Sequence, residues 1–276
     1  MNIINTYNKV KKLFIDNNNF NYNQWSIYAD SILPGLADLL ERDSTDYNYE
    51  RDILPTITNA LVSKEKLYML HQSFLTVTKH LQHRIVAVFG IDIDVDIILY
   101  LGLCNGAGWA TNIHGRKSIL LGIEKIVELD WFDENSMIAL IYHELGHIWH
   151  ESIRTTKENN ITQGKKNMWQ VYTEGVAMYC EQLLYDKPHY YHQDKNGWLI
   201  WCNSNKDIVI SEYKKRIISN ESVQEFFGDW NKFLDHSDVG YYIGTEFIYY
   251  LSKKYKLDEI ATLNMDVITE EFLSFK

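Results

Sequence analysis

Two histidines four residues apart constrain this chain of 276 residues more than any other feature. His143 and His147 stand in the sequence Tyr-His-Glu-Leu-Gly-His, inside a segment from Met137 to Trp149 whose apolar residues recur with helical spacing. On a helix, side chains at positions i and i+4 lie on one face, with Cβ atoms roughly 5–6 Å apart. The segment is therefore predicted to form a helix, capped by Asp133, that presents two imidazoles to one point in space.

Glu144, which directly follows the first histidine, favours a catalytic role for this pair. Imidazoles at this spacing bind zinc, and Glu144 lies beside the first histidine, where a general base is needed. Because the chain has 10 histidines, the alternative is a pair of core histidines hydrogen-bonded to backbone carbonyls. The adjoining glutamate favours the zinc site. We therefore expect a metallohydrolase in which zinc and Glu144 activate a water molecule.

A catalytic zinc ion usually has three protein ligands and leaves its fourth position to water. A metzincin would have Gly and His three and six residues after the second histidine, but His150 and Ile153 occupy those positions. In the class with a glutamate ligand, the third ligand comes from a later helix. We predict Glu174, on a helix that Gly175 and Ala177 keep narrow beside the carboxylate. The alternative is a solvated glutamate on an ordinary surface helix.

Three motifs stand at residues 143–147 (His-Glu-Leu-Gly-His), 173–175 (Thr-Glu-Gly) and 240–244 (Gly-Tyr-Tyr-Ile-Gly). Together they resemble the predicted zinc-dependent proteases of the gluzincin clan, a bacterial domain family of largely unknown function. The similarity extends upstream through residues 105–111 and 119–124, so that it covers residues 95–255. The N-terminal third of the chain lies outside it.

The resemblance implies a zincin-like core within an α+β, mainly helical fold. It implies that one Zn²⁺ ion is bound by His143, His147 and Glu174, and that Glu144 is the base. It also implies a downstream tyrosine that stabilises the oxyanion, which is Tyr241 here, with Tyr242 as the alternative. Position 178 departs from the family because it holds Met instead of an aspartate that orients a ligand imidazole. The candidates for that orienting role are Glu181, Glu151, Asp235 and Asp238.

Strand signals precede the motif helix. Val95 to Leu103 is nearly all apolar, Ser118 to Ile123 follows the same pattern, and Trp109 to Ile113 is predicted to be an edge strand between them. In zincins the edge strand borders the cleft and pairs with an extended substrate. The predicted substrate-binding residues are Gly108, Trp109 and Ala110. The alternative is a hairpin whose glycines serve only the turns.

Glu124 follows the second of these strands directly. In aminopeptidases of related architecture a glutamate near the edge strand captures the substrate amine. Capping of the following helix is the alternative that we favour for Glu124.

The expected organisation is a helical region at residues 1–90 followed by the metallopeptidase core at 91–276. Because no Ser, Gly or Pro-rich linker divides the chain, we treat this boundary as a subdivision of one compact unit. Within the core we expect a small mixed or antiparallel sheet in residues 91–128, active-site helices at 133–152 and 167–184, and C-terminal helices at 207–276. The polar segment 154–167 is predicted to be a loop at the rim of the cleft. The first N-terminal helix is expected at Ile3 to Ile15.

Charge and composition exclude several partners. A net charge of -10 argues against nucleic acid, because phosphate binding requires concentrated Lys and Arg. No apolar run approaches the roughly 20 residues of a membrane-spanning helix. Three widely spaced cysteines form no disulfide framework. We expect a cytoplasmic protein that acts on a peptide or protein substrate, and the sequence does not indicate its oligomeric state.

Two other functions are compatible with the same ligands. A non-catalytic zinc-stabilised binding or regulatory protein, derived from a protease, would keep His143, His147 and Glu174. It would have no need of Glu144 or of a tyrosine framed by glycines, so their presence favours an enzyme. A zinc hydrolase of a non-peptide amide would need every one of these residues, and the sequence does not distinguish it from a peptidase.

Overall fold

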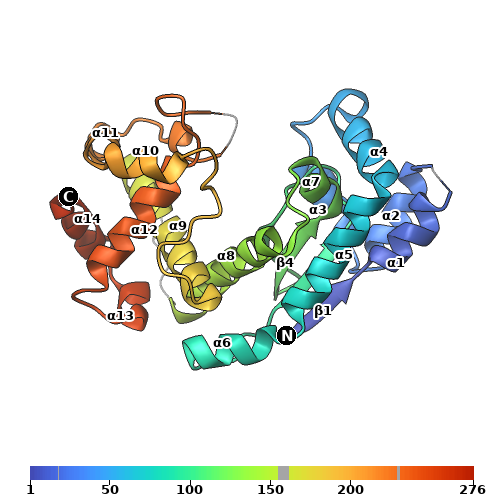
Figure 1. Cartoon of the computed structure of the whole chain (residues 1–276), viewed down its shortest axis with the longest axis horizontal. Coiled ribbons are helices and arrows are strands. Elements are labelled where there is room, and N and C mark those ends of the chain that lie inside the picture. Colours follow the sequence, from blue (N-terminus) through green and yellow to red (C-terminus); the bar gives the residue numbers. More distant parts are fainter. Residues whose placement is uncertain (18, 155–161, 229–230) are drawn as a thin grey trace. The chain divides into compact units, whose positions relative to one another are not determined.

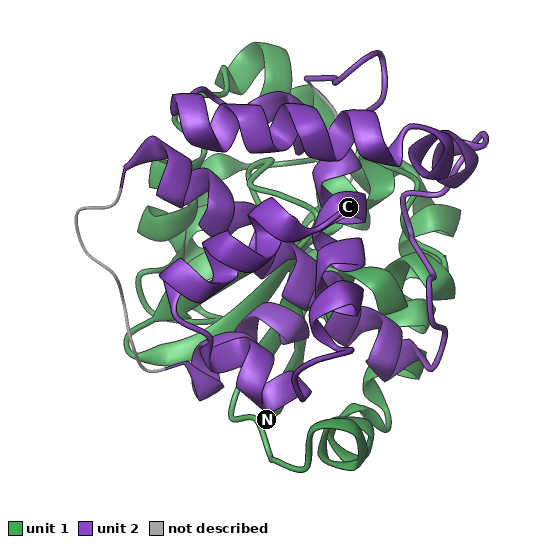
Figure 2. Cartoon of the chain, turned by 90° about the vertical axis from the view of Figure 1, so that its left-hand side faces the viewer, with its two compact units in different colours: residues 1–144 green, residues 145–276 purple. Residues whose placement is uncertain are grey.

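The computed structural model describes residues 1–17, 19–154, 162–228 and 231–276 (Figure 1). The fold is α+β and mainly helical, as predicted, with one four-stranded mixed sheet. The chain separates into two compact units, residues 1–144 and 145–276 (Figure 2). The division falls inside helix α8 (Glu134–Ile153), so that the N-terminal half of this helix belongs to the first unit and its C-terminal half to the second.

The sheet lies in the first unit and has the strand order β1-β2-β4-β3. Its strands are β1 (Asn2–Asn5), β2 (Asp96–Tyr100), β3 (Trp109–Ile113) and β4 (Arg116–Gly122). The pairs β1–β2 and β2–β4 are parallel, whereas β3 and β4 form an antiparallel hairpin. Every residue of β2 is buried, as expected of a nearly continuous apolar run. The three predicted strands are therefore confirmed. The predicted edge strand, β3, lies at one edge of the sheet.

The prediction of a helix over Ile3 to Ile15 is wrong at its start. Residues Asn2–Asn5 form β1, which is joined to β2 by hydrogen bonds such as Asn2 N to Val95 O, at 2.9 Å. Helical structure begins only at Tyr7, directly after Thr6, whose hydroxyl donates to Leu99 O at 2.7 Å. A four-residue strand is too short to show an alternating pattern, and only its partner strand fixes its conformation.

Helices cover the sheet of the first unit. They are α1 (Tyr7–Val10), α2 (Tyr22–Asp30), α3 (Leu36–Asp43), α4 (Leu54–Val62), α5 (Lys64–Thr78), α6 (Leu81–Phe89) and α7 (Ile123–Glu128), with π-helical turns η1 (Lys11–Ile15) and η2 (Tyr49–Ile53). Buried aromatic side chains join α2 to the end of β2. Trp25 Nε1 donates to Leu101 O at 2.9 Å, and the Tyr28 hydroxyl accepts from Leu101 N at the same distance.

In the described residues of the second unit, the regular elements are helices, and Phe233 and His236 form an isolated antiparallel bridge. Beside the end of α8 this unit contains α9 (Gln163–Tyr185), α10 (Trp198–Ser204), α11 (Lys206–Ser219), α12 (Val239–Leu251), α13 (Leu257–Thr262) and α14 (Met265–Ser274), with the 3-10 turn η3 (Gln224–Phe226). Helices α9 and α12 cross with their backbones in contact. A Cβ atom on Gly175 would lie 2.3 Å from Gly244 O, so the crossing requires glycine.

The long helix α9 begins earlier than predicted. It starts at Gln163, where the side chain of Thr162 accepts from Lys165 N, so the end of the predicted loop 154–167 is helical. Residues 155–161 of that predicted rim lie outside the described residues. Among the helices that the structure describes, none combines the length and apolar character that crossing a membrane requires.

Candidate metal centre

Helix α8 begins as the sequence predicts. The Asp133 carboxylate accepts from Asn135 N at 2.9 Å and from the Ser136 hydroxyl at 2.6 Å, and Met137 N donates to Asp133 O. An aspartate in this position satisfies amides that have no partner within the helix. The helix then runs without interruption to Ile153, so His143 and His147 lie one turn apart on it.

Two helices bring the three predicted metal ligands together. Nε2 of His147 on α8 lies 3.3 Å from Oε2 of Glu174 on α9. With His143 included, the three side chains each offer one ligand atom, and these atoms lie within 4.8 Å of one another. His143 is 8% exposed, whereas the side chains of His147 and Glu174 are 22% and 20% exposed. We call these three residues the metal triad.

A close helix crossing holds the two ligands of the second unit together. Gly146, next to His147, faces α9, and a Cβ atom there would lie 2.7 Å from Cα and 2.8 Å from O of Ala177. Ala177 follows Glu174 by three residues, nearly one helical turn. Small residues on both helices therefore let the backbones approach closely where the imidazole and the carboxylate must meet.

The donors of the metal triad fit a zinc ion. Two imidazoles and one carboxylate are ligands that zinc accepts, and three protein ligands are the usual number at a catalytic site. In the described ranges, the metal triad is the one group of three or more His, Cys, Asp or Glu residues arranged to hold a metal. Its partial exposure leaves a side open to solvent, which a site that binds water and substrate needs.

The predicted base lies beside the predicted edge strand. Glu144 is partly exposed, and its Cγ atom is 3.8 Å from the position that a Cβ atom on Gly108 would occupy. Leu140, one turn earlier on α8, and Leu121 on β4 lie at 3.3 and 3.4 Å from the same point. The N-terminal half of α8 therefore packs on the strand end at Gly108, and a larger residue there would press on α8.

The register of the hairpin shows which backbone groups of β3 point away from the sheet. Trp109 is paired with Leu120, and Gly122 N donates to Ala107 O at 3.2 Å. Because hydrogen-bonded and non-bonded pairs alternate in antiparallel strands, the odd-numbered residues bond to β4. The amide and carbonyl groups of the even-numbered residues therefore face outward, and these residues are Gly108, Ala110 and Asn112.

The three predicted substrate-binding residues are thus not equivalent. Gly108 and Ala110 present backbone groups at the outer edge of β3, whereas the backbone of Trp109 is directed to β4. The Trp109 side chain is partly exposed, and its Nε1 donates to the Tyr100 hydroxyl at 3.3 Å. Asn112, which sequence analysis did not single out, has the same outward register as Ala110 and is exposed.

The two candidate tyrosines on α12 have different surroundings. Tyr242 is 1% exposed, and its hydroxyl donates to Oδ1 of Asn203 at 2.8 Å. Tyr241 is partly exposed and packs edge-on against Phe227, with 5.4 Å between ring centroids. Tyr242 therefore has an interior partner, while Tyr241 retains access to solvent.

Contacts between aromatic rings connect Tyr241 with the surroundings of Glu174. The ring centroids of Phe227 and Tyr213 are 6.3 Å apart, and burial together with the nearby Glu174 carboxylate raises the pKa of Tyr213. The Tyr213 hydroxyl itself donates to Asn167 O at 2.8 Å. Glu174 also directly precedes Gly175, whose backbone is in close contact with the backbone of Gly244 on α12. Both observations associate the start of α12 with the Glu174 end of the site.

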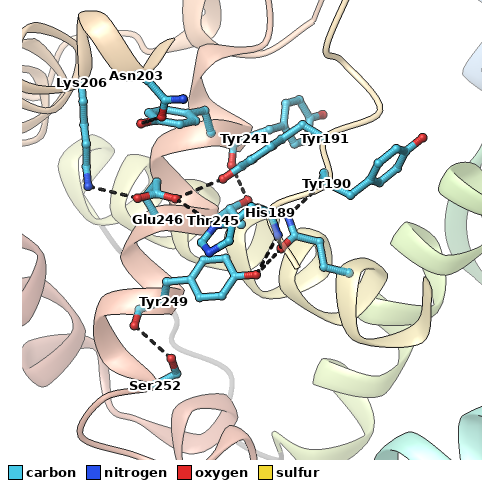
Figure 3. A network of polar contacts seen from close by, with 12 residues as sticks. His189, Tyr190, Tyr191, Asn203, Lys206, Tyr241, Thr245, Glu246, Tyr249 and Ser252 are labelled. Carbon is cyan, nitrogen blue, oxygen red and sulfur yellow. Dashed lines mark hydrogen bonds and ion pairs between the residues drawn. The ribbon is translucent and has the colours of Figure 1, made fainter. Parts of the chain in front are cut away.

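A polar network anchors α12 beyond these tyrosines (Figure 3). The Glu246 carboxylate binds Lys206 Nζ at 3.1 Å and accepts from the Tyr191 hydroxyl at 3.4 Å. The His189 ring stacks on Tyr249 at 4.2 Å, and His189 N donates to the Tyr249 hydroxyl. The network joins the segment after α9 to α11 and α12, so it fixes the helix that carries Tyr241.

Of the residues proposed to orient the ligand imidazoles, Glu181 has the clearest alternative partner. It is fully buried on α9, two turns after Glu174, and His192 Nδ1 lies 3.0 Å from its Oε1. Asp238 accepts from Gly228 N at 2.9 Å, and Glu151 is exposed. The contact between Glu181 and His192 was not predicted, because the two residues come from a helix and a loop whose pairing has no sequence pattern.

Glu124 lies where the sequence suggested, at the first turn of α7, but it is sealed from solvent. It is 0% exposed, with Gly102 N donating to Oε2 at 2.7 Å and Cys104 N donating to Oε1 at 3.0 Å. Burial raises the pKa of Glu124 to about 6, against the opposing effect of these amides. The carboxylate therefore holds the loop after β2 in place, and a substrate amine has no access to it.

Comparison with known proteins adds no relative. No protein-family model, no curated protein and no solved structure matches this chain.

Proposed function

We propose that this protein is a zinc-dependent peptide-bond hydrolase with a zincin-like core of the gluzincin type. The observation that carries the proposal is the metal triad, whose ligand atoms lie within 4.8 Å of one another on α8 and α9. The partly exposed Glu144 between the two histidines supports a hydrolase over a purely structural metal site.

The chemistry divides between the metal and the chain. Zinc, when bound by His143, His147 and Glu174, supplies a Lewis acid that makes water nucleophilic near neutral pH. Glu144 removes a proton from the attacking water and delivers it to the leaving amine. Each of these residues is a side chain of α8 or α9, so the helix crossing at Gly146 and Ala177 maintains their spacing.

The outward groups of β3 supply the binding of an extended peptide. A substrate strand that pairs with this edge forms backbone hydrogen bonds with Ala110 and Asn112 and passes Gly108, next to Glu144. The absence of a side chain at Gly108 lets the substrate backbone approach the base. Trp109 supports the strand through Tyr100 instead of pairing with the substrate.

Tyr241 is the proposed donor to the oxyanion. Its partial exposure and its connection to Glu174 through Phe227 and Tyr213 favour it over Tyr242, whose hydroxyl is bound to Asn203. Removing one donor of this kind typically costs about 2.7–4 kcal/mol of transition-state stabilisation. Tyr241→Phe is therefore expected to lower turnover, and Tyr242→Phe is its matched control.

The test is profiling of zinc-loaded protein against a mixed peptide library. We expect cleavage by the wild type, retained zinc with activity essentially lost in Glu144→Gln, and turnover lowered at least 100-fold in Tyr241→Phe. Full activity of Glu144→Gln would exclude Glu144 as the base. Turnover of Tyr241→Phe within a few-fold of the wild type would remove Tyr241 from its role.

The same experiment separates the alternative functions. A protein that binds zinc but cleaves no peptide, and that hydrolyses small amides in a manner dependent on Glu144, is a hydrolase of non-peptide amides. A protein that binds zinc and hydrolyses neither class of substrate is a zinc-stabilised binding protein. A wild-type protein that binds no zinc contradicts all three functions.

A further inference from the structure

The end of helix α13 connects the two helices that carry the metal ligands. Carbonyl groups at and just after its end take part, because the last carbonyls of a helix have no partner within the helix. His150 Nε2 on α8 lies 3.2 Å from Ala261 O, and the Tyr172 hydroxyl on α9 donates to Ile260 O. Neighbouring carbonyls of one short helix thus accept from α8 and from α9.

Arg154 strengthens the same connection from the end of α8. Its Nη1 donates to Leu263 O at 2.6 Å and lies 3.4 Å from Ala261 O. Its guanidinium also lies over the ring of Trp169 on α9, 4.6 Å from the centroid, and the His150 ring is 5.3 Å from that of Tyr172. We call His150, Arg154 and Tyr172, with the carbonyls they contact, the α13 bracket.

The groups of the bracket are buried and directional. His150 is 3% exposed and Tyr172 is 0% exposed. Burial, with smaller effects of Arg154 and His147, lowers the pKa of His150 to about 4, so the ring is neutral near pH 7. A neutral imidazole whose Nε2 faces a carbonyl carries its proton there, because a carbonyl can only accept. The contact therefore fixes the orientation of the ring as well as its position.

The bracket lies close to the metal triad along both helices. His150 follows His147 by three residues on α8, and Tyr172 precedes Glu174 by two residues on α9. The Gly146 to Ala177 contact is a second attachment between these helices. Two attachments on each helix resist both sliding and rotation, whereas a single crossing point leaves rotation about that point.

We propose that His150, Arg154 and Tyr172 are positioning residues that hold α8 and α9 at the spacing that the metal triad requires. This inference rests on the proposed function, because it assumes that the triad binds a metal. A site preorganised in this way loses little entropy when the metal binds, and loss of supporting groups around metal ligands typically weakens affinity 10- to 100-fold.

The test measures the dissociation constant for Zn²⁺ by competition with a chelator, and the visible spectrum of the Co²⁺-loaded full-length protein. We expect Tyr172→Phe and His150→Leu each to weaken Zn²⁺ binding about tenfold and to change the Co²⁺ spectrum. His150→Gln, whose amide can still donate to Ala261 O, is expected to restore most of the affinity. Tyr172→Phe decides the outcome by itself if His150→Leu fails to fold.

A matched control separates positioning from loss of stability. Tyr28 is a buried tyrosine of the first unit whose hydroxyl also contacts the backbone, so Tyr28→Phe should lower the melting temperature without changing the dissociation constant for Zn²⁺. Unchanged Zn²⁺ affinity and an unchanged Co²⁺ spectrum in Tyr172→Phe would overturn the bracket and leave the proposed function intact. A wild-type protein without Zn²⁺ affinity would overturn both.

Discussion

Two glutamates that the sequence marks as candidates for function have opposite surroundings, one in each unit. Glu124 is fully buried, and both of its oxygens accept from backbone amides of the loop after β2. Glu174 is partly exposed and faces the imidazole of His147 across a helix crossing. Backbone amides of the fold already occupy the first carboxylate, while the second lies beside an imidazole with which it can bind a cation.

Burial and hydrogen-bond partners distinguish a structural carboxylate from a candidate metal ligand. Backbone amides that point at a carboxylate are fixed by the chain and use its lone pairs, so such a group stabilises a loop. Ligand groups need lone pairs that a metal can reach from a side open to water. Substitutions at the two glutamates and at the helix crossing test this contrast.

The largest effect is expected from Glu174→Leu, which removes one of three proposed ligands. Apparent zinc binding energies in small proteins reach about 10–16 kcal/mol, so loss of one ligand should cost about 4 kcal/mol, or roughly a thousandfold in affinity. Titration with Zn²⁺ in the presence of a competing chelator measures it. Glu124→Leu is the matched control and should retain wild-type affinity. Equal Zn²⁺ affinities in Glu174→Leu and Glu124→Leu would contradict the assignment of Glu174 as a ligand.

Gly146→Ala tests whether the site of Glu174 depends on close approach of the helices. The added methyl group would lie 2.7 Å from the backbone of Ala177, so α8 and α9 must separate. Overpacking of this kind costs typically 1–3 kcal/mol, and we expect about 3 kcal/mol here with weaker Zn²⁺ binding. Denaturant unfolding and Zn²⁺ titration report the two effects. Gly108→Ala, whose added methyl group meets only side chains, should change both stability and Zn²⁺ affinity less.

Glu124→Leu should lower stability by about 2–3 kcal/mol. The substitution leaves the buried amides of Gly102 and Cys104 without their acceptor, and an unsatisfied buried donor costs about 1–3 kcal/mol. Urea unfolding at pH 7 measures the change. Glu174→Leu, at a partly exposed position, should change the stability of the metal-free protein by less. A larger loss in Glu174→Leu than in Glu124→Leu would reverse the assignment of the two glutamates.

The smallest effect is a pH dependence specific to Glu124. Its pKa in the folded protein, about 6, lies above the ordinary value of 4.5, so the folded state binds the proton more tightly than the unfolded state. The contribution of Glu124 to stability is therefore full below pH 4.5 and falls as the pH rises to 6, by about 2 kcal/mol in total. The wild type should exceed Glu124→Leu in stability by more at pH 4.5 than at pH 7. An advantage that grows with pH would contradict the raised pKa.

The parts of the fold that have a strong periodic signal were predictable from the sequence. The strands β2, β3 and β4 follow apolar runs and a turn, and α8 follows its cap at Asp133 and its apolar stripe. Strand β1 was missed because four residues carry no pattern of their own. The start of α9 was placed late, because residues 163–167 are polar and their helical conformation depends on the cap at Thr162.

The candidate site was predictable where local spacing fixes geometry. His143, Glu144 and His147 follow from one helical turn, and Glu174 was inferred from its narrow helix. The bracket of His150, Arg154 and Tyr172 was not predictable, because its acceptors are backbone carbonyls about 90 to 110 residues away in the chain. The outward register of Asn112 likewise depends on the hairpin turn, where His114 and Gly115 both have positive φ.

The outer edge of β3, at the border of the sheet, carries a risk of aggregation. Unpaired amides and carbonyls on a strand can pair with a strand of another molecule, which is a common route to aggregation. This edge is only five residues long, Trp109–Ile113, and it ends in a tight turn. Its shortness limits how many hydrogen bonds an intruding chain can form, so the protein can display a reactive strand edge and still resist self-association through it.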